Sequence, residues 1–85
     1  MISLEDCVTL SGLEADEVAA ISEHEHVPEM AAAALARSLL DSAGGAERIR
    51  LMIEDDIDAA LAVGRLAHAR ELSAALRRFV ETHLI

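Results

Sequence analysis

The 85-residue sequence contains no tryptophan, tyrosine or lysine, and Phe79 is its only phenylalanine. The absence of lysine excludes Schiff-base chemistry, which needs a lysine amine. Aromatic residues that favour strands are nearly missing, whereas alanine, the best helix former, is abundant. We therefore expect a core built from Leu, Ile, Val and Met side chains and from close contacts between alanine-bearing helices.

Cys7 is the only cysteine, which excludes an internal disulfide and a zinc site made of several thiolates from one chain. At helical spacing Cys7 groups with Leu4 and Val8, so we interpret it as a packing thiol. No Gly-x-Ser-x-Gly nucleophile elbow is present. Short helices around an alanine-rich core should also leave little room for a ligand pocket of several hundred Å³. We expect no enzymatic activity and, most simply, no cofactor.

Long apolar runs are absent as well. Hydrophobic residues make up 53% of the chain, but no run approaches the roughly 20 residues of a transmembrane helix. The first six residues lack the basic and apolar regions of a secretory signal. A chain of this length has room for one hydrophobic core. We expect a single domain over residues 1–85, located in the cytoplasm.

The net charge of −9 is distributed unevenly. Residues 1–43 hold nine acidic residues and one arginine, a net charge of −8, whereas residues 44–85 hold seven acids and six arginines, a net charge of −1. An acidic half repels phosphate backbones, and the aromatics that stack on bases are missing. Helices that lie on membranes usually carry a polar face rich in Lys and Arg. These features argue against nucleic acid and membranes as partners and favour a basic protein surface or a cation.

Apolar residues recur at helical spacing along the whole chain. The pattern predicts a short helix over residues 4–10 and longer helices over about 13–25, 28–43, 46–63 and 66–84. We therefore expect an all-α fold, a compact bundle of four main helices preceded by one short N-terminal helix. The turn at Gly64 and Arg65 is so short that the last two helices should form an antiparallel hairpin.

Local signals predict where these helices begin and end. Ser11 and Glu14 have capping-box spacing, in which the Ser11 side chain accepts a hydrogen bond from the Glu14 backbone. Pro28 suits the first position of the third helix, and Gly44 with Gly45 should end that helix. The acidic residues 54–58 lack the glycine and the spaced ligands of a calcium loop, so we interpret them as a solvated helix face.

The densest set of candidate ligands comprises Glu23, His24, Glu25 and His26. Glu23 and His26 have the Glu-x-x-His spacing that places a carboxylate and an imidazole on one side of a helix in di-iron bundles. In an extended segment, His24 and His26 would instead alternate onto one side. Neither geometry completes a site, although a symmetric dimer could supply further ligands. We predict that an iron or zinc ion, if one binds, uses these four residues.

A simpler interpretation of the same segment is a polar helix end, where the helix dipole favours the positive charge of histidine. A third interpretation is a pH-sensitive contact. The other two histidines have plain structural explanations. His68 should form a weak surface pair with Glu71, three residues later, and His83 should pack on the ring of Phe79.

Three stretches carry a resemblance to other proteins: residues 23–29 (E-H-E-H-V-P-E), residues 48–57 and residues 68–72. Over these stretches and most of its length, the chain resembles a group of small uncharacterised all-helical bacterial proteins. The resemblance implies a helical fold and a bacterial cytoplasmic setting. It implies no activity, because none is established for the group.

The leading functional hypothesis is a non-enzymatic interaction module, an adaptor or regulatory protein that binds a protein partner or self-associates as a homodimer. The chain has more apolar residues than one small core can cover, and the excess can be buried between protomers. The residues expected to contribute lie beside the main apolar stripes: Met30, Leu51, Met52 and Leu84. The alternative hypothesis is a transition-metal-binding protein that uses Glu23, His24, Glu25 and His26.

Overall fold

The computed structural model describes residues 3–84 and is all-helical over this range. Its five helices are α1 (Leu4–Ser11), α2 (Ala15–Glu25), α3 (Glu29–Leu40), α4 (Gly45–Ala62) and α5 (Leu66–His83). The all-α prediction is therefore confirmed. Within residues 3–84, no helix is long and apolar enough to cross a membrane.

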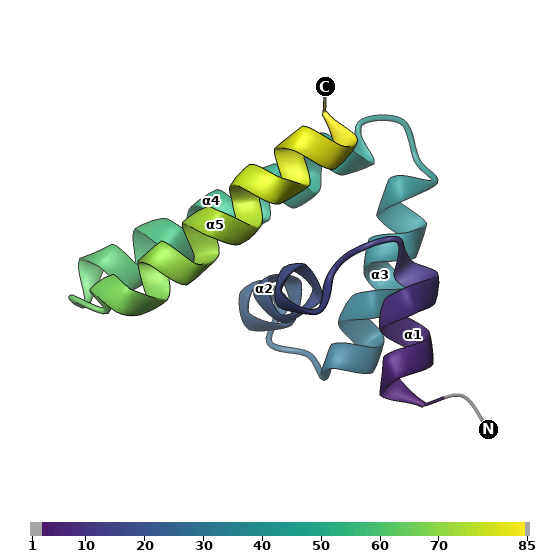
Figure 1. Ribbon diagram of the computed structural model, residues 1–85, viewed down its shortest axis with the longest axis horizontal. Helices are drawn as coiled ribbons and strands as arrows, with labels where there is room; N and C mark the ends of the chain where they lie inside the picture. Colours follow the sequence, from purple (N-terminus) through teal and green to yellow (C-terminus); the bar gives the residue numbers. More distant parts are fainter. Residues whose placement is uncertain (1–2, 85) are drawn as a thin grey trace.

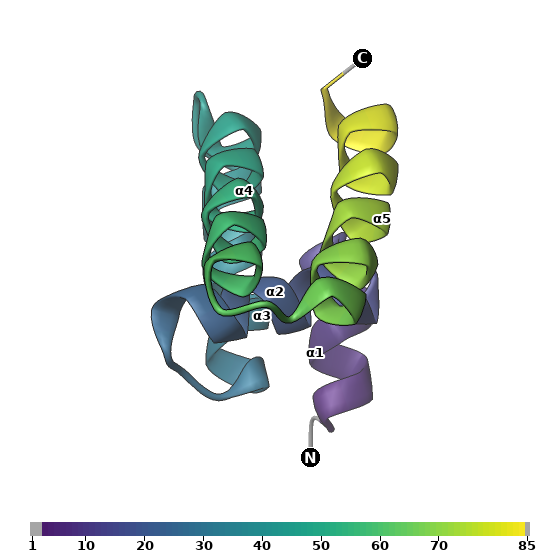
Figure 2. The same ribbon diagram turned by 90° about the vertical axis from the view of Figure 1, so that its left-hand side faces the viewer.

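The helices are arranged as a long hairpin and a three-helix group (Figure 1). α4 and α5, each of 18 residues, run antiparallel and side by side, as predicted. α1 lies beside α3, and α2 contacts α3, α4 and α5, so that α2 joins the two parts (Figure 2). The expected division into four main helices and one short helix is not confirmed. Two helices are long, and the other three have 8, 11 and 12 residues.

The core is aliphatic except for one ring. Its largest fully buried apolar side chains come from α2, α4 and α5: Val18, Ile21, Ile49, Ile53 and Phe79. α3 contributes Ala32, Ala33 and Ala36, which are all buried and whose small side chains let neighbouring helices approach closely. As predicted, Cys7 is half-buried against this core, and the ring of His83 stacks on Phe79 with 4.7 Å between centroids.

The junction between α3 and α4 requires glycine. A Cβ atom on Gly45 would lie 1.5 Å from the carbonyl oxygen of Leu39, so no larger residue fits without moving the backbone. Gly44 has a φ of +75°, in the left-handed region that glycine adopts without strain. The prediction that these glycines end the third helix is wrong: α3 ends at Leu40 with Asp41 as its C-cap, whereas Gly44 is the N-cap of α4 and Gly45 its first residue.

α2 begins at Ala15, two residues later than predicted, and its capping box lies about one turn later than predicted. Ser11 is still the last residue of α1, and its hydroxyl donates to the carbonyl of Val8 at 2.6 Å and accepts from the Leu13 amide at 3.1 Å. The capping box instead pairs Glu14 with Glu17, whose side chain accepts from the Glu14 amide at 2.8 Å. Pro28 precedes the first residue of α3 and acts as its N-cap. The shift at the start of α2 follows from Gly12, whose left-handed conformation at φ +83° ends α1.

Two side chains of α4 are more buried than the sequence pattern indicated. Met52, expected beside the main apolar stripe, is only 8% exposed, and Asp56, expected on a solvated face, is only 5% exposed. Both expectations are wrong for the same reason. α4 is contacted by α2, α3 and α5, so more of its circumference is buried than a single apolar stripe on one face predicts.

Candidate functional site

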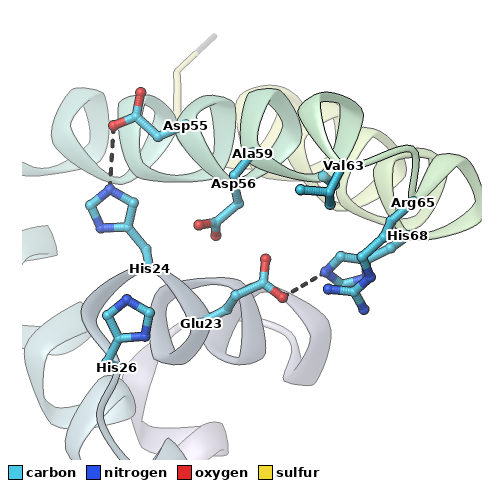
Figure 3. A pocket seen from close by; sticks show the side chains of 10 residues that line it. Glu23, His24, His26, Asp55, Asp56, Ala59, Val63, Arg65 and His68 are labelled. Carbon is cyan, nitrogen blue, oxygen red and sulfur yellow. Dashed lines mark hydrogen bonds and ion pairs between the residues drawn. The ribbon is translucent and has the colours of Figure 1, made fainter.

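A pocket of about 460 Å³ lies between the C-terminal half of α2 and the closed end of the α4–α5 hairpin (Figure 3). It is larger than we expected for helices of this length. Its lining combines carboxylates, imidazoles and small apolar groups: Glu23, His24, His26, Asp55, Asp56, Ala59, Ala60, Val63, Arg65 and His68. Three of the four predicted ligands, all except Glu25, therefore line one pocket.

Two contacts between imidazoles and carboxylates hold α2 to the hairpin across this pocket. Nε2 of His68 lies 2.6 Å from Oε1 of Glu23, and Nε2 of His24 lies 3.3 Å from Oδ2 of Asp55. The predicted pair of His68 and Glu71 is also present, with Nδ1 of His68 at 3.8 Å from the carboxylate. The shorter contact, to Glu23, joins residues 45 positions apart, so no local spacing could have indicated it.

His26 does not extend the helix as the Glu-x-x-His interpretation required. Its φ of +56° is left-handed and ends α2. In Figure 3 the carboxylate of Glu23 is turned toward His68, and the ring of His26 lies on the other side of the pocket. The helical Glu-x-x-His geometry, one of the two alternatives, is therefore not formed. Within residues 3–84, no group of three or more His, Cys, Asp or Glu side chains is arranged to hold a metal ion.

His24 keeps one feature of a metal-binding histidine. Its Nδ1 is buried, has no hydrogen-bond partner among residues 3–84, and lies 4.0 Å from Oε2 of Glu25. If Nε2 donates its proton to Asp55, Nδ1 has a free lone pair. Metal-binding histidines commonly have this arrangement, in which a carboxylate fixes the ring through the second nitrogen.

Asp56 is the most unusual group in the pocket. Its Oδ2 is buried without a hydrogen-bond partner in the described part of the chain, and Figure 3 shows its carboxyl group pointing into the space between Glu23 and His24. Burial, and after it the negative charge of Glu23, raises its pKa to about 7, against the opposing charge of His24. Asp56 therefore exchanges a proton near neutral pH.

The sequence contained one signal for this burial. Asp56 follows Met52 by four residues and precedes Ala60 by four, which places it on the same side of the helix as these two core residues. The surrounding acids made residues 54–58 resemble a uniform solvated face and concealed this spacing.

The pocket contains acids and bases but no serine or cysteine nucleophile among its lining residues. This arrangement suits proton uptake and the binding of a cation. A scan of protein-family models and searches of curated proteins and of solved structures each find no significant match.

Proposed function

We propose that this protein is a small acidic interaction module of the cytoplasm, an adaptor or regulatory protein without catalytic activity, that self-associates as a homodimer. The observation that carries this proposal is an apolar groove of about 380 Å³ on the side of the α4–α5 hairpin away from the polar pocket. Leu61 and Leu66, 51% and 58% exposed, line this groove with Ile57 and Ala69. Burying such side chains between two copies is favourable by the hydrophobic effect.

The charges beside the groove suit a second copy of the same chain. Arg70 and Arg77 line the α5 side and have no ion-pair partner among residues 3–84. Asp58 is exposed on α4, three residues before Leu61 and so on the same side of that helix. A two-fold axis across the groove places α4 of each protomer over α5 of the other. Asp58 of each protomer then lies toward Arg70 and Arg77 of the second copy.

The residues first expected at the interface divide into two groups. Met30 and Leu51 are exposed, as an interface requires, but they lie outside the groove. Met52 belongs to the core and Leu84 is half-buried against it, so both have less surface free to contact a partner than Met30 and Leu51 have. Leu61 and Leu66 take their place in the proposal.

Light scattering of the untagged protein over a concentration series tests the proposal. We expect a mass that rises from monomer to dimer and a Leu61→Glu variant that stays monomeric. Leu51→Glu is the matched control, because Leu51 lies on the same helix and is 48% exposed but outside the groove. A wild-type protein that is monomeric throughout would overturn self-association. A dimer lost in Leu51→Glu and kept in Leu61→Glu would overturn the choice of surface.

A second candidate function, transition-metal binding, is supported by Nδ1 of His24, which has no hydrogen-bond partner among residues 3–84. With Glu23 engaged by His68, the remaining ligands of the predicted set are His24, Glu25 and His26. Elemental analysis of untagged protein should then find iron or zinc that a His24→Ala/His26→Ala variant lacks and a His68→Ala variant keeps. Thermal melting should also shift on addition of a chelator. Substoichiometric metal that is equal in all variants would exclude this function.

A further inference from the structure

The carboxyl group of Asp56 has no structural role that accounts for its burial. Ionised carboxylates are costly to bury unless they are paired or hydrogen-bonded. The other buried polar side chains, Ser11 and Glu17, both have hydrogen-bond partners. Oδ2 of Asp56 has none in the described residues, and the carboxyl group of Asp56 points into the space between Glu23 and His24, so that a second carboxylate also lines the pocket (Figure 3). Glu23 has one partner, Nε2 of His68, so the two carboxyl groups together have more acceptor positions than the described residues fill with donors.

We propose that this pocket binds a primary alkylammonium group, with the nitrogen between the carboxylates of Asp56 and Glu23 and the aliphatic chain against Ala59 and Val63. This binding is independent of self-association, because the apolar groove uses a different side of α4. The lining supplies both parts of such a ligand with contacts: acids for its charge and small apolar side chains for its methylene groups.

An ammonium group fits the pocket better than a metal ion. Nε2 of His24 and Nε2 of His68 are engaged by Asp55 and Glu23, and the carboxylates and imidazoles of residues 3–84 form no cluster of three metal ligands. A metal ion needs several ligands at fixed distances. An ammonium is a compact charge with three rotatable donors, so two carboxylates and solvent satisfy it without such geometry.

The source of the amine is outside this chain. The sequence contains no lysine, so a second copy cannot insert a lysine side chain into the pocket. The ligand is therefore a free alkylamine or a lysine side chain of another protein, and the two share one chemistry at the site. Both sources are compatible with the acidic surface, which attracts cations.

The other charged groups at the pocket determine how binding depends on pH. Those that face Asp56 are Glu23 and His24 on α2, Asp55 on α4, His68 on α5 and Arg65 in the turn before α5. Because the pKa of Asp56 is raised to about 7, its negative charge forms as the pH rises through neutrality. Alkylamines keep their proton up to about pH 10, as lysine does. Affinity should therefore increase between pH 6 and pH 8.

Amide chemical-shift titration of the untagged full chain with n-butylamine at pH 8 tests the proposal. We expect saturable shifts around residues 56–68 that n-butanol, the neutral ligand of similar shape, does not produce. Asp56→Asn should weaken binding about tenfold or more, since a charged hydrogen bond is lost. Glu81→Gln removes one negative charge from an exposed residue outside both the pocket and the groove and should change affinity less than about twofold, as expected for a screened surface charge.

Three further results sharpen or overturn the proposal. Arg65→Ala should strengthen binding, because it removes a like charge from the lining, and Leu61→Glu should leave it unchanged. Binding of Nα-acetyl-lysine methylamide as well as n-butylamine would indicate a lysine side chain as the natural ligand, whereas binding of n-butylamine alone would indicate a free amine. Two results with the wild-type protein would overturn the proposal: no saturable shifts with n-butylamine, or equal shifts with n-butanol. It would also be overturned by equal affinity in Asp56→Asn, or by stoichiometric Zn²⁺ that is held by Asp56 and displaces the amine.

Discussion

The two ends of α2 each meet a buried carboxyl group, but only one of these groups is satisfied by the protein. Near the N-terminal end, Glu17 is 2% exposed, accepts a hydrogen bond from the Glu14 amide, and has its Oε2 3.6 Å from Nε of Arg78. Arg78 is itself held by Asp16. Opposite the C-terminal half of α2, Asp56 is 5% exposed and its Oδ2 has no partner in the described part of the chain.

The difference separates a structural acid from a candidate binding group. Burial raises the pKa of both. For Glu17 the hydrogen bond from Glu14 and the charge of Arg78 oppose that rise, so the side chain stabilises the start of α2. For Asp56 the next contribution after burial, the charge of Glu23, raises the pKa further. A carboxyl placed beside another carboxyl weakens the fold unless a cation or a proton joins them.

The largest effect on stability is expected from Asp56→Asn. The folded protein binds a proton at Asp56 up to a pH of about 7, whereas the unfolded chain releases it near pH 4. The stability that this proton supplies is therefore complete below pH 4 and is lost as the pH rises through 7. The loss amounts to at most about 4 kcal/mol, since one pKa unit corresponds to about 1.4 kcal/mol. The neutral side chain of Asp56→Asn avoids this loss of stability.

Urea unfolding of both proteins at pH 5 and pH 8 measures this difference. Asp56→Asn should be similar to the wild-type protein at pH 5 and more stable at pH 8. Glu81→Gln, with the same loss of one negative charge on an exposed residue, should show no such dependence on pH. If Asp56→Asn were less stable than the wild type at pH 8, Asp56 would have to be a satisfied structural acid like Glu17, and the contrast between the two ends of α2 would fail.

A smaller loss of stability is expected from Glu17→Ala. This change removes the acceptor for the Glu14 amide and leaves Arg78 with one carboxylate fewer, so the free energy of unfolding should fall by about 1–3 kcal/mol. Glu17→Gln keeps an acceptor at the same place and should stay within about 1 kcal/mol of the wild type. Thermal and urea unfolding measure both variants. An equal loss in the two would show that the charge of Glu17 matters and the hydrogen bond does not.

The smallest effect is expected from His68→Ala, which removes the contact with Glu23. Both side chains are partly solvent-exposed, so the pair should contribute only about 0.5 kcal/mol at pH 7. His26→Ala is the matched control, because the His26 side chain is exposed and forms no hydrogen bond among residues 3–84. A loss above about 2 kcal/mol in His68→Ala would mean that this contact, and not the aliphatic core, holds α2 to the hairpin.

The helices could be predicted from the sequence because their signals are local. Apolar spacing, the glycines at positions 44, 45 and 64, and the short turn before Leu66 give the number of helices and the α4–α5 hairpin. The start of α2 was missed because Ser11 and Glu14 each offer capping chemistry, and the left-handed turn at Gly12 selected Glu14. Three of the four residues singled out from the sequence, Glu23, His24 and His26, line the pocket, whereas Asp56 and His68 join it from other helices.

What the sequence determined by itself is thus an acidic, alanine-rich, five-helix chain with its densest set of candidate ligands at the end of α2. The tertiary structure alone decided which acids are buried and which histidine each carboxylate meets. The physical reason is that burial depends on how many helices cover a given face. α4 is covered by α2, α3 and α5, and this packing encloses Asp56 although the residues beside it remain in solvent.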